Sequence, residues 1–241
     1  MKIIEKFIKK QVKYSSDRTP TIAFFGDSVT HGCFDVYVKN NIMETYVDTK
    51  SGYPEKVRYI FNTLYPDIPI NIINSGISGD NATNGFKNRL ERDVLSFNPD
   101  LVVVCFGLND SMQGEKGLDE YKSSMSGIFK SVKEQGAEVI LLTPNLMTDK
   151  VEIPFGDELL DSSLKSVIAR VKEGWPARYI NEAKKEAKLQ NIPICDCNRI
   201  WENLVKNGVN VNNLLSNRIN HPTKDMHWLF AYELVRTIFD N

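Results

Sequence analysis

The chain has 241 residues, of which 41% are hydrophobic and 25% are charged, an ordinary composition for a globular protein of one large or two small domains. Thirty lysines and arginines against 31 aspartates and glutamates give a formal net charge of -1. This balance supplies no basic field for nucleic acid or for an acidic membrane surface. We therefore expect a small-molecule partner, with no nucleic acid and no membrane.

The cysteines and the N-terminal residues indicate in which cellular compartment the protein is expected. Cys105 lies in an apolar run and is typical of a buried, reduced thiol, while Cys195 and Cys197 lack a second Cys or His pair at zinc-ligand spacing. Residues 1–10 carry a charge every few positions, so they lack the apolar core of a signal peptide. We expect a cytoplasmic protein without a bound metal.

Residues 1–14 predict a short amphipathic helix, because their apolar residues recur at helical spacing. The apolar residues are few, which favours docking on the domain over insertion into lipid. No linker rich in glycine, serine or proline, internal repeat or low-complexity block divides the chain. We expect a single domain over residues 1–241.

Five apolar runs alternate with segments of helical periodicity along the chain. Runs that are apolar on both faces are typical of a parallel sheet covered by helices, and the alternation predicts a βαβ series in an α/β fold. Pro193 lies in the fifth run and favours an edge position, since proline cannot donate to a central ladder. The runs cover residues 21–25, 70–73, 101–106, 139–142 and 192–195.

Two long segments without clean periodicity follow strands, at residues 29–51 and 144–160. In an open parallel sheet, ligands bind beyond the carboxyl ends of the strands. We expect both segments at that end of the sheet.

Ser28 directly follows the first predicted strand, within Gly26-Asp27-Ser28-Val29-Thr30. A serine there faces the crevice and can sit at a helix N-terminus, where backbone amides stabilise a developing anion. The alternative is a plain N-cap serine. Thr30 stands where the nucleophile elbow G-x-S-x-G has its second glycine, which disfavours an ordinary α/β-hydrolase.

Two further polar groups follow the second and third predicted strands. Gly79 lies in a strand-to-helix turn where an exposed backbone N–H could approach a ligand. Asn109 places a side-chain amide at the same edge of the sheet. Together with Ser28, they would form a nucleophile with donors for an acyl oxyanion.

A serine nucleophile needs a base, and the chain has only three histidines. His31 would have to fold back over its own turn, so substrate contact or solvent exposure is favoured for it. His227 falls in the last predicted helix, where a structural role is favoured. His221 remains; Pro222 suits the first position of the final helix and would leave His221 on the preceding loop.

These blocks, Gly26-Asp27-Ser28, Gly79, Gly107-Leu108-Asn109-Asp110 and His221-Pro222, resemble those of the SGNH (GDSL-like) hydrolases in order and in placement. The resemblance implies a flavodoxin-like three-layer α/β/α sandwich with a five-stranded parallel sheet and an ester hydrolase without metal or organic cofactor. It also implies Ser28 as nucleophile, His221 as base, and an oxyanion hole from the N–H groups of Ser28 and Gly79 with the Asn109 side chain.

The sequence departs from the family at one position. The family usually carries an aspartate three residues before the histidine, and this chain has Arg218 there. Replacing the orienting carboxylate of a triad by an amide can cost about 10⁴ in rate. Three explanations stay open: a backbone carbonyl orients His221 in a Ser-His dyad, another carboxylate reaches it, or the enzyme is weak. The carboxylates considered are Asp196, Glu202 and Asp225.

The substrate is less defined than the reaction. Segment 31–50 offers Phe34, Tyr37 and Tyr46 among polar residues, which suits a sugar or a small acyl group. The alternative is that these rings simply pack the loops against the domain. We expect hydrolysis of short acyl esters, with O-acetyl groups of a carbohydrate as the leading substrate. The alternatives are a lipase or thioesterase on longer chains, and a degenerate member that binds without turnover. A homodimer is compatible with the sequence.

Overall fold

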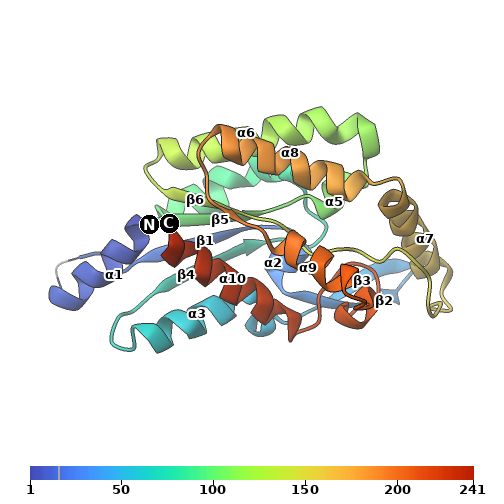
Figure 1. Cartoon of the computed structure of the whole chain (residues 1–241), viewed down its shortest axis with the longest axis horizontal. Helices are drawn as coiled ribbons and strands as arrows, with labels where there is room; N and C mark the ends of the chain where they lie inside the picture. Colours follow the sequence, from blue (N-terminus) through green and yellow to red (C-terminus); the bar gives the residue numbers. More distant parts are fainter. Residues whose placement is uncertain (16) are drawn as a thin grey trace.

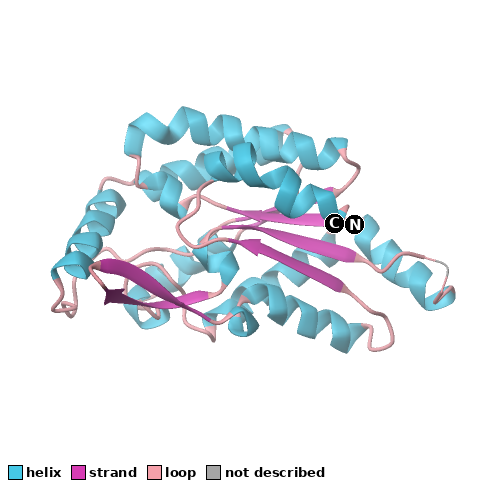
Figure 2. Cartoon of the chain, turned by 180° about the vertical axis from the view of Figure 1, so that it is seen from behind, coloured by secondary structure: helices cyan, strands magenta, loops and turns pink. Residues whose placement is uncertain are grey.

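Each of the five apolar runs forms one strand of a single parallel sheet in the computed structural model, which describes residues 1–15 and 17–241. The sheet has the order β4-β1-β5-β6-β7, and helices cover both of its faces (Figures 1 and 2). The predicted α/β sandwich with a five-stranded parallel sheet is confirmed. The strands are β1 (Thr21–Gly26), β4 (Asn71–Gly76), β5 (Leu101–Cys105), β6 (Glu138–Leu142) and β7 (Ile194–Cys195).

Counted along the chain, these parallel strands lie in the order 2-1-3-4-5 of the doubly wound flavodoxin-like fold. The strand order reverses between β1 and β5, so the crevice for a ligand is expected beyond the carboxyl ends of these two strands. β7 pairs only with β6 and forms one edge of the sheet, as Pro193 predicted.

The helices form two layers. One side of the sheet is covered by α1 (Lys2–Val12), α3 (Tyr53–Leu64), α9 (Cys197–Lys206) and α10 (Met226–Asp240). The other side is covered by α4 (Ala82–Asn84) with its π-helical continuation η2 (Gly85–Val94), and by α6 (Leu118–Glu134) and α8 (Trp175–Leu189). At the carboxyl end of the sheet lie α2 (Ser28–His31), α5 (Leu108–Ser111) and α7 (Glu158–Lys172). Short 3₁₀ turns complete the chain: η1 (Thr49–Ser51), η3 (Leu95–Phe97), η4 (Gly114–Gly117) and η5 (Val211–Leu214).

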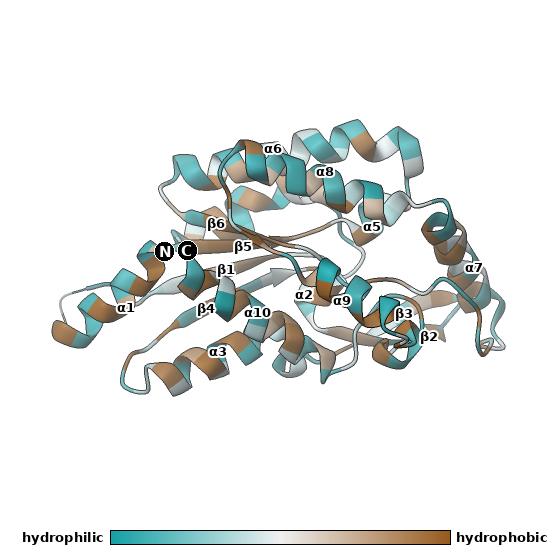
Figure 3. Cartoon of the chain, in the orientation of Figure 1, coloured by the Kyte–Doolittle hydropathy of each residue, from teal (hydrophilic) through white to brown (hydrophobic). Residues whose placement is uncertain are grey.

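Two hydrophobic cores lie on the two faces of the sheet, because successive side chains of a strand point to opposite sides. In β1, Phe24 belongs to one core and Phe25 to the other. Figure 3 shows the hydrophobic colour concentrated in the strands of the sheet. Ile3 and Phe7 of α1 are buried in the first core, so α1 packs on the domain. No helix in the described ranges has both the length and the hydropathy to cross a membrane.

The first irregular segment contains an antiparallel hairpin that the sequence analysis did not predict. It consists of β2 (Cys33–Lys39) and β3 (Ile42–Val47), joined by Asn40 and Asn41, both at positive φ (53° and 58°). Two residues at positive φ suit the tight turns that match strand twist, and asparagine tolerates them. The Asn-Asn pair between two β-branched and aromatic runs was therefore a usable signal.

The start of the last helix also differs from the prediction. α10 begins at Met226, not at Pro222. Pro222 instead forms an antiparallel bridge with Leu215, and the adjacent N–H of Thr223 donates to the carbonyl of Leu214 at 2.9 Å. These contacts hold the segment extended, and His221 lies on that loop as expected.

Candidate active site

Ser28 is positioned by the sharp turn that follows β1. Asp27 is the N-cap of α2, and its side chain accepts the N–H of Val29 at 3.0 Å. A Cβ at Gly26 would lie 2.2 Å from Oγ1 of Thr30, so only glycine lets the helix fold back this closely. Ser28 is 4% exposed, and it stands at the helix N-terminus beyond the strand, as the sequence indicated.

His221 comes from the far end of the chain to meet Ser28. Its Nε2 lies 3.0 Å from Ser28 Oγ, and its Nδ1 lies 2.9 Å from the carbonyl oxygen of Phe34. A carbonyl can only accept, so Nδ1 carries the proton and Nε2 accepts the hydroxyl hydrogen of Ser28. This is the tautomer that a general base for the serine requires.

The partner of Nδ1 distinguishes between two of the explanations left open by Arg218, a backbone carbonyl and another carboxylate. Both ring nitrogens of His221 are occupied by Ser28 and by the Phe34 carbonyl, so none of the three carboxylates considered fills the orienting role. Arg218 points elsewhere: its Nη1 donates to the carbonyl of Ile153 at 3.2 Å, and its guanidinium lies 4.2 Å from the Phe155 ring centroid. The geometry corresponds to a Ser-His dyad oriented by a backbone carbonyl.

The imidazole is kept neutral by its surroundings. Burial lowers the pKa of His221 to about 4, while the Phe34 carbonyl and the charge of Asp35 act weakly in the opposite direction. Burial disfavours the charged ring. The Nε2 lone pair is therefore available at neutral pH.

Asn217 supports His221 and was missed in the sequence analysis. Its Oδ1 accepts the backbone N–H groups of Ile219, Asn220 and His221 at 3.0, 2.9 and 2.9 Å. The asparagine thus fixes the loop that presents the imidazole. Asparagine side chains often bond to the backbone two or more residues on, so its place four residues before His221 was a signal that could have been used.

The predicted oxyanion donors lie around Ser28. Gly79 follows β4 in a left-handed conformation (φ 77°), and within the described part of the chain no hydrogen bond occupies the N–H of Ser28 or of Gly79. Asn109 Nδ2 donates to the carbonyl of Asp80 at 2.7 Å, and a primary amide has a second N–H to offer. The structure therefore places three amide groups and the predicted nucleophile around one cavity.

That cavity has a volume of about 180 Å³ and brings all four predicted site residues together. This volume is small compared with the roughly 300–1,000 Å³ of drug-sized ligand pockets. The hairpin provides one wall through Val36, Met43 and Thr45. The other side chains are apolar (Leu108, Met112, Met147, Val167, Ile219) or polar (Ser78, Ser163, Asn217, Asn220).

The other two histidines have different contacts. His227 is completely buried and its Nδ1 accepts the N–H of Tyr53 at 3.1 Å; burial lowers its pKa to about 3. His31 Nδ1 accepts the N–H of Ser78 at 3.3 Å, so it contacts the loop that bears Gly79. Phe34 is buried and packs 5.1 Å from the His227 ring, which for this ring favours packing over sugar contact.

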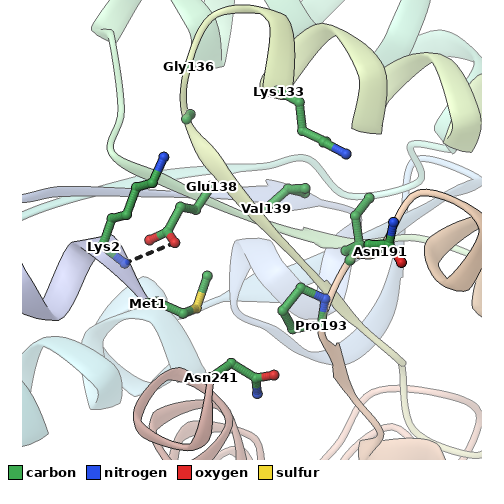
Figure 4. Close-up of a pocket in the computed structure, with 11 residues that line it drawn as sticks. Met1, Lys2, Lys133, Gly136, Glu138, Val139, Asn191, Pro193 and Asn241 are labelled. Atoms are coloured by element: carbon green, nitrogen blue, oxygen red, sulfur yellow. Dashed lines mark hydrogen bonds between the residues drawn. The ribbon is translucent and has the colours of Figure 1, made fainter.

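A larger cavity, of about 440 Å³, lies at the opposite, amino end of β6 (Figure 4). Two of its charged side chains bond other parts of the chain: the Glu138 carboxylate accepts the N–H groups of Lys2 and Ile3 at 2.9 Å, and Lys133 donates to the carbonyl of Gln190 at 2.8 Å. Residues 1–15 and 17–241 contain no cluster of three or more His, Cys, Asp or Glu side chains suited to a metal ion.

The sandwich and the Ser28-His221 pair, which lines one cavity with the predicted amide donors, have the arrangement expected of a hydrolase with a serine nucleophile. The model of the GDSL-like lipase/acylhydrolase family matches residues 24–229, most of the chain. The protein belongs to this family, and the predicted membership is confirmed.

Two curated relatives share part of the sequence. An acetylxylan esterase of Geobacillus stearothermophilus is 33% identical over 103 residues, which cover 39% of this chain and 47% of that protein. An arylesterase of Vibrio mimicus is 30% identical over 98 residues, covering 38% and 48%. The matched region spans about half the length of each relative.

Solved structures resemble the whole fold. The structure of an acetylxylan esterase from Geobacillus stearothermophilus has a TM-score of 0.67 at 23% identity and covers 91% of this chain and 94% of that one. An alpha/beta hydrolase enzyme from the metagenome of Lake Arreo, Spain, has a TM-score of 0.66 at 19% identity and covers 90% and 94%. These matches support the assigned fold.

Proposed function

We propose that the protein is a serine ester hydrolase for short acyl esters, above all O-acetyl groups of a carbohydrate. The observation that carries the proposal is the chain of hydrogen bonds from the Phe34 carbonyl through His221 to Ser28, which borders a small cavity together with three amide donors. The cavity volume favours an acetyl over a long acyl chain, and its polar lining can bond a sugar hydroxyl. The similarity to an acetylxylan esterase supports the same substrate class.

The reaction follows from the tautomer of His221. As Ser28 Oγ attacks the ester carbonyl carbon, its proton passes to Nε2 and the carbonyl electron pair moves to oxygen. The N–H groups of Ser28 and Gly79 and the Asn109 amide stabilise that oxyanion. Collapse of the tetrahedral intermediate expels the alcohol, which takes the proton from Nε2. Water then repeats both steps on the acyl-enzyme and releases the acid.

The test combines covalent labelling with hydrolysis. The wild type should react with a fluorophosphonate probe, and it should hydrolyse 4-nitrophenyl acetate faster than the octanoate and release acetate from acetylated xylo-oligosaccharides. Ser28→Ala should abolish labelling and lower kcat by more than about 10⁴-fold. Ser126→Ala is the matched control, because this serine lies on α6 and bonds Gln190.

Three results would decide against the proposal. A folded wild type that neither labels nor turns over any ester would indicate a binding protein. Full activity in Ser28→Ala would exclude the assigned nucleophile. Preference for the octanoate would indicate a lipase or thioesterase.

A further inference from the structure

Two buried carboxyl groups beside the site take no part in the proposed reaction. Asp27 and Asp110 follow β1 and β5, the strands at which the sheet order reverses, and both are at most 4% exposed. Each uses one oxygen to accept a backbone N–H: Asp27 from Val29 at 3.0 Å, and Asp110 from Ala82 at 2.9 Å. Among the described residues, neither second oxygen has a partner.

Asp110 connects the two loops that bear the oxyanion donors. It follows Asn109 directly, and Ala82 lies three residues after Gly79. The Asn109 amide bonds the carbonyl of Asp80, and the Asp110 carboxyl bonds the N–H of Ala82. Two neighbouring side chains thus hold the Gly79 loop at two points.

Side-chain packing gives little support to the loop at Gly79, whose N–H is the predicted oxyanion donor. A Cβ built on Gly79 would meet nothing within 4 Å, and the residue adopts φ 77°. A glycine in open space has many accessible conformations. The position of its N–H therefore depends on polar contacts at either side.

The surroundings of Asp110 disfavour the ionised form of its carboxyl group. The buried Arg89 is paired with the neighbouring acid Asp80, and burial raises the pKa of Asp110 to about 7. A buried acid with one unpartnered oxygen is unfavourable for stability. Asp100, at the opposite end of β5, is also buried, yet it is bonded by Thr21 N–H, Lys6 and Arg18. Strained or unsatisfied groups in folded proteins concentrate at functional sites.

We propose that Asp110 is a positioning residue for the oxyanion hole: by holding the N–H of Ala82, it fixes the Gly79 amide relative to Asn109 and Ser28. The inference rests on the proposed esterase activity. Asp110 contacts no substrate in this scheme and acts only through the geometry of the loop.

The first experiment compares Asp110→Ala with Asp110→Asn in steady-state hydrolysis of 4-nitrophenyl acetate. Alanine removes the acceptor, so kcat should fall about 10- to 100-fold with KM nearly unchanged, because donors misplaced by about 1 Å lose transition-state stabilisation. Asparagine keeps an acceptor oxygen and should restore kcat to within about threefold of the wild type. Combining Asp110→Ala with Asn109→Ala should cost less than the product of the two single effects, since both act on one oxyanion hole.

A second variant removes the same hydrogen bond from its other side. Ala82 is the first residue of α4, where proline is well tolerated, and the preceding Asn81 is extended (φ -138°, ψ 166°) as a residue before proline should be. Ala82→Pro should therefore fold and reproduce the loss of kcat, even if Asp110→Ala does not fold. Asp100→Ala is the matched control and should lower the Tm without changing kcat.

The outcomes separate the two proposals. Wild-type kcat in folded Asp110→Ala or in Ala82→Pro, strictly multiplicative effects with Asn109→Ala, or an asparagine variant as impaired as the alanine one would each overturn the positioning role alone. A wild type without ester hydrolysis would overturn the proposed function and this inference together.

Discussion

The polar side chains at the two ends of the parallel sheet differ in how completely they are hydrogen-bonded. At the amino end, Asp100 is bonded by a backbone N–H and two cations, and Glu138 accepts two N–H groups of α1. At the carboxyl end, Asp27, Asp110 and Asn145 each keep one buried oxygen without a partner in the described ranges. The amino end is built for attachment of α1, whereas the carboxyl end tolerates unsatisfied groups beside the nucleophile.

The unsatisfied polar groups indicate the candidate active site better than cavity volume does. The cavity at the amino end is larger than the one at Ser28, but its Glu138 and Lys133 side chains already bond other parts of the chain. The smaller cavity contains a hydroxyl, a neutral imidazole and amide donors. Substitutions at the carboxyl end should therefore lower activity, whereas substitutions at the amino end should lower stability.

After the loss expected for Ser28→Ala, the largest effect is expected at the oxyanion hole. Asn109→Ala removes one donor and should lower kcat about 10²- to 10³-fold, while KM for 4-nitrophenyl acetate changes little. Steady-state kinetics on the folded variant measure this. A loss confined to KM would show that Asn109 binds the ground state only.

The pH profile tests the neutral His221. Because burial lowers its pKa to about 4 from about 6.5 in an unfolded chain, the acid limb of kcat/KM should lie near pH 4. Between those values the unfolded chain binds a proton at His221 that the folded chain does not, so the contribution of His221 to the free energy of unfolding should decrease as the pH falls from about 6.5. The raised pKa of Asp110 contributes in the opposite direction over this range. A half-maximal kcat/KM near pH 6.5 would contradict the buried, neutral base.

A smaller effect is expected for the support of the imidazole. Asn217→Ala removes the acceptor of three N–H groups and should lower kcat about tenfold as the His221 loop loosens. Asn217→Asp keeps the oxygen and should stay within about threefold. Equal impairment of both variants would argue against an acceptor role.

The smallest effect on turnover is expected at the amino end. Glu138→Ala removes the carboxylate that accepts the N–H groups of Lys2 and Ile3, so it should destabilise the protein by about 1 kcal/mol. The value of kcat/KM should not change. Thermal unfolding and kinetics on one preparation check both, and a clear loss of kcat would break the proposed separation of the two ends.

Much of the fold could be predicted from the sequence because buried parallel strands are apolar on both faces. The run 101–106 is an example, and β5 occupies all but its last residue. The hairpin was not predicted because β2 and β3 are largely exposed and their polar and apolar residues follow no clear pattern. Pro222 misled the assignment of the last helix, since a bridge to Leu215 decided its conformation.

The features of the site also differ in whether the sequence could predict them. Ser28, Gly79 and Asn109 could be placed together because each follows a strand of one parallel sheet, and His221 emerged from the scarcity of histidine. Their roles in turnover remain predictions. The partner of His221 Nδ1 could not be identified, because it is a backbone carbonyl on a hairpin that had not been predicted.

The Phe34 carbonyl has a consequence for how this site can vary in evolution. A peptide oxygen is present whatever amino acid occupies position 34, so no single-codon replacement there deletes the acceptor of Nδ1. The chain can therefore carry an arginine at position 218 while the imidazole keeps its tautomer. The vulnerable changes are insertions and deletions within residues 33–47, which would shift the register of the hairpin and move that oxygen away from the ring.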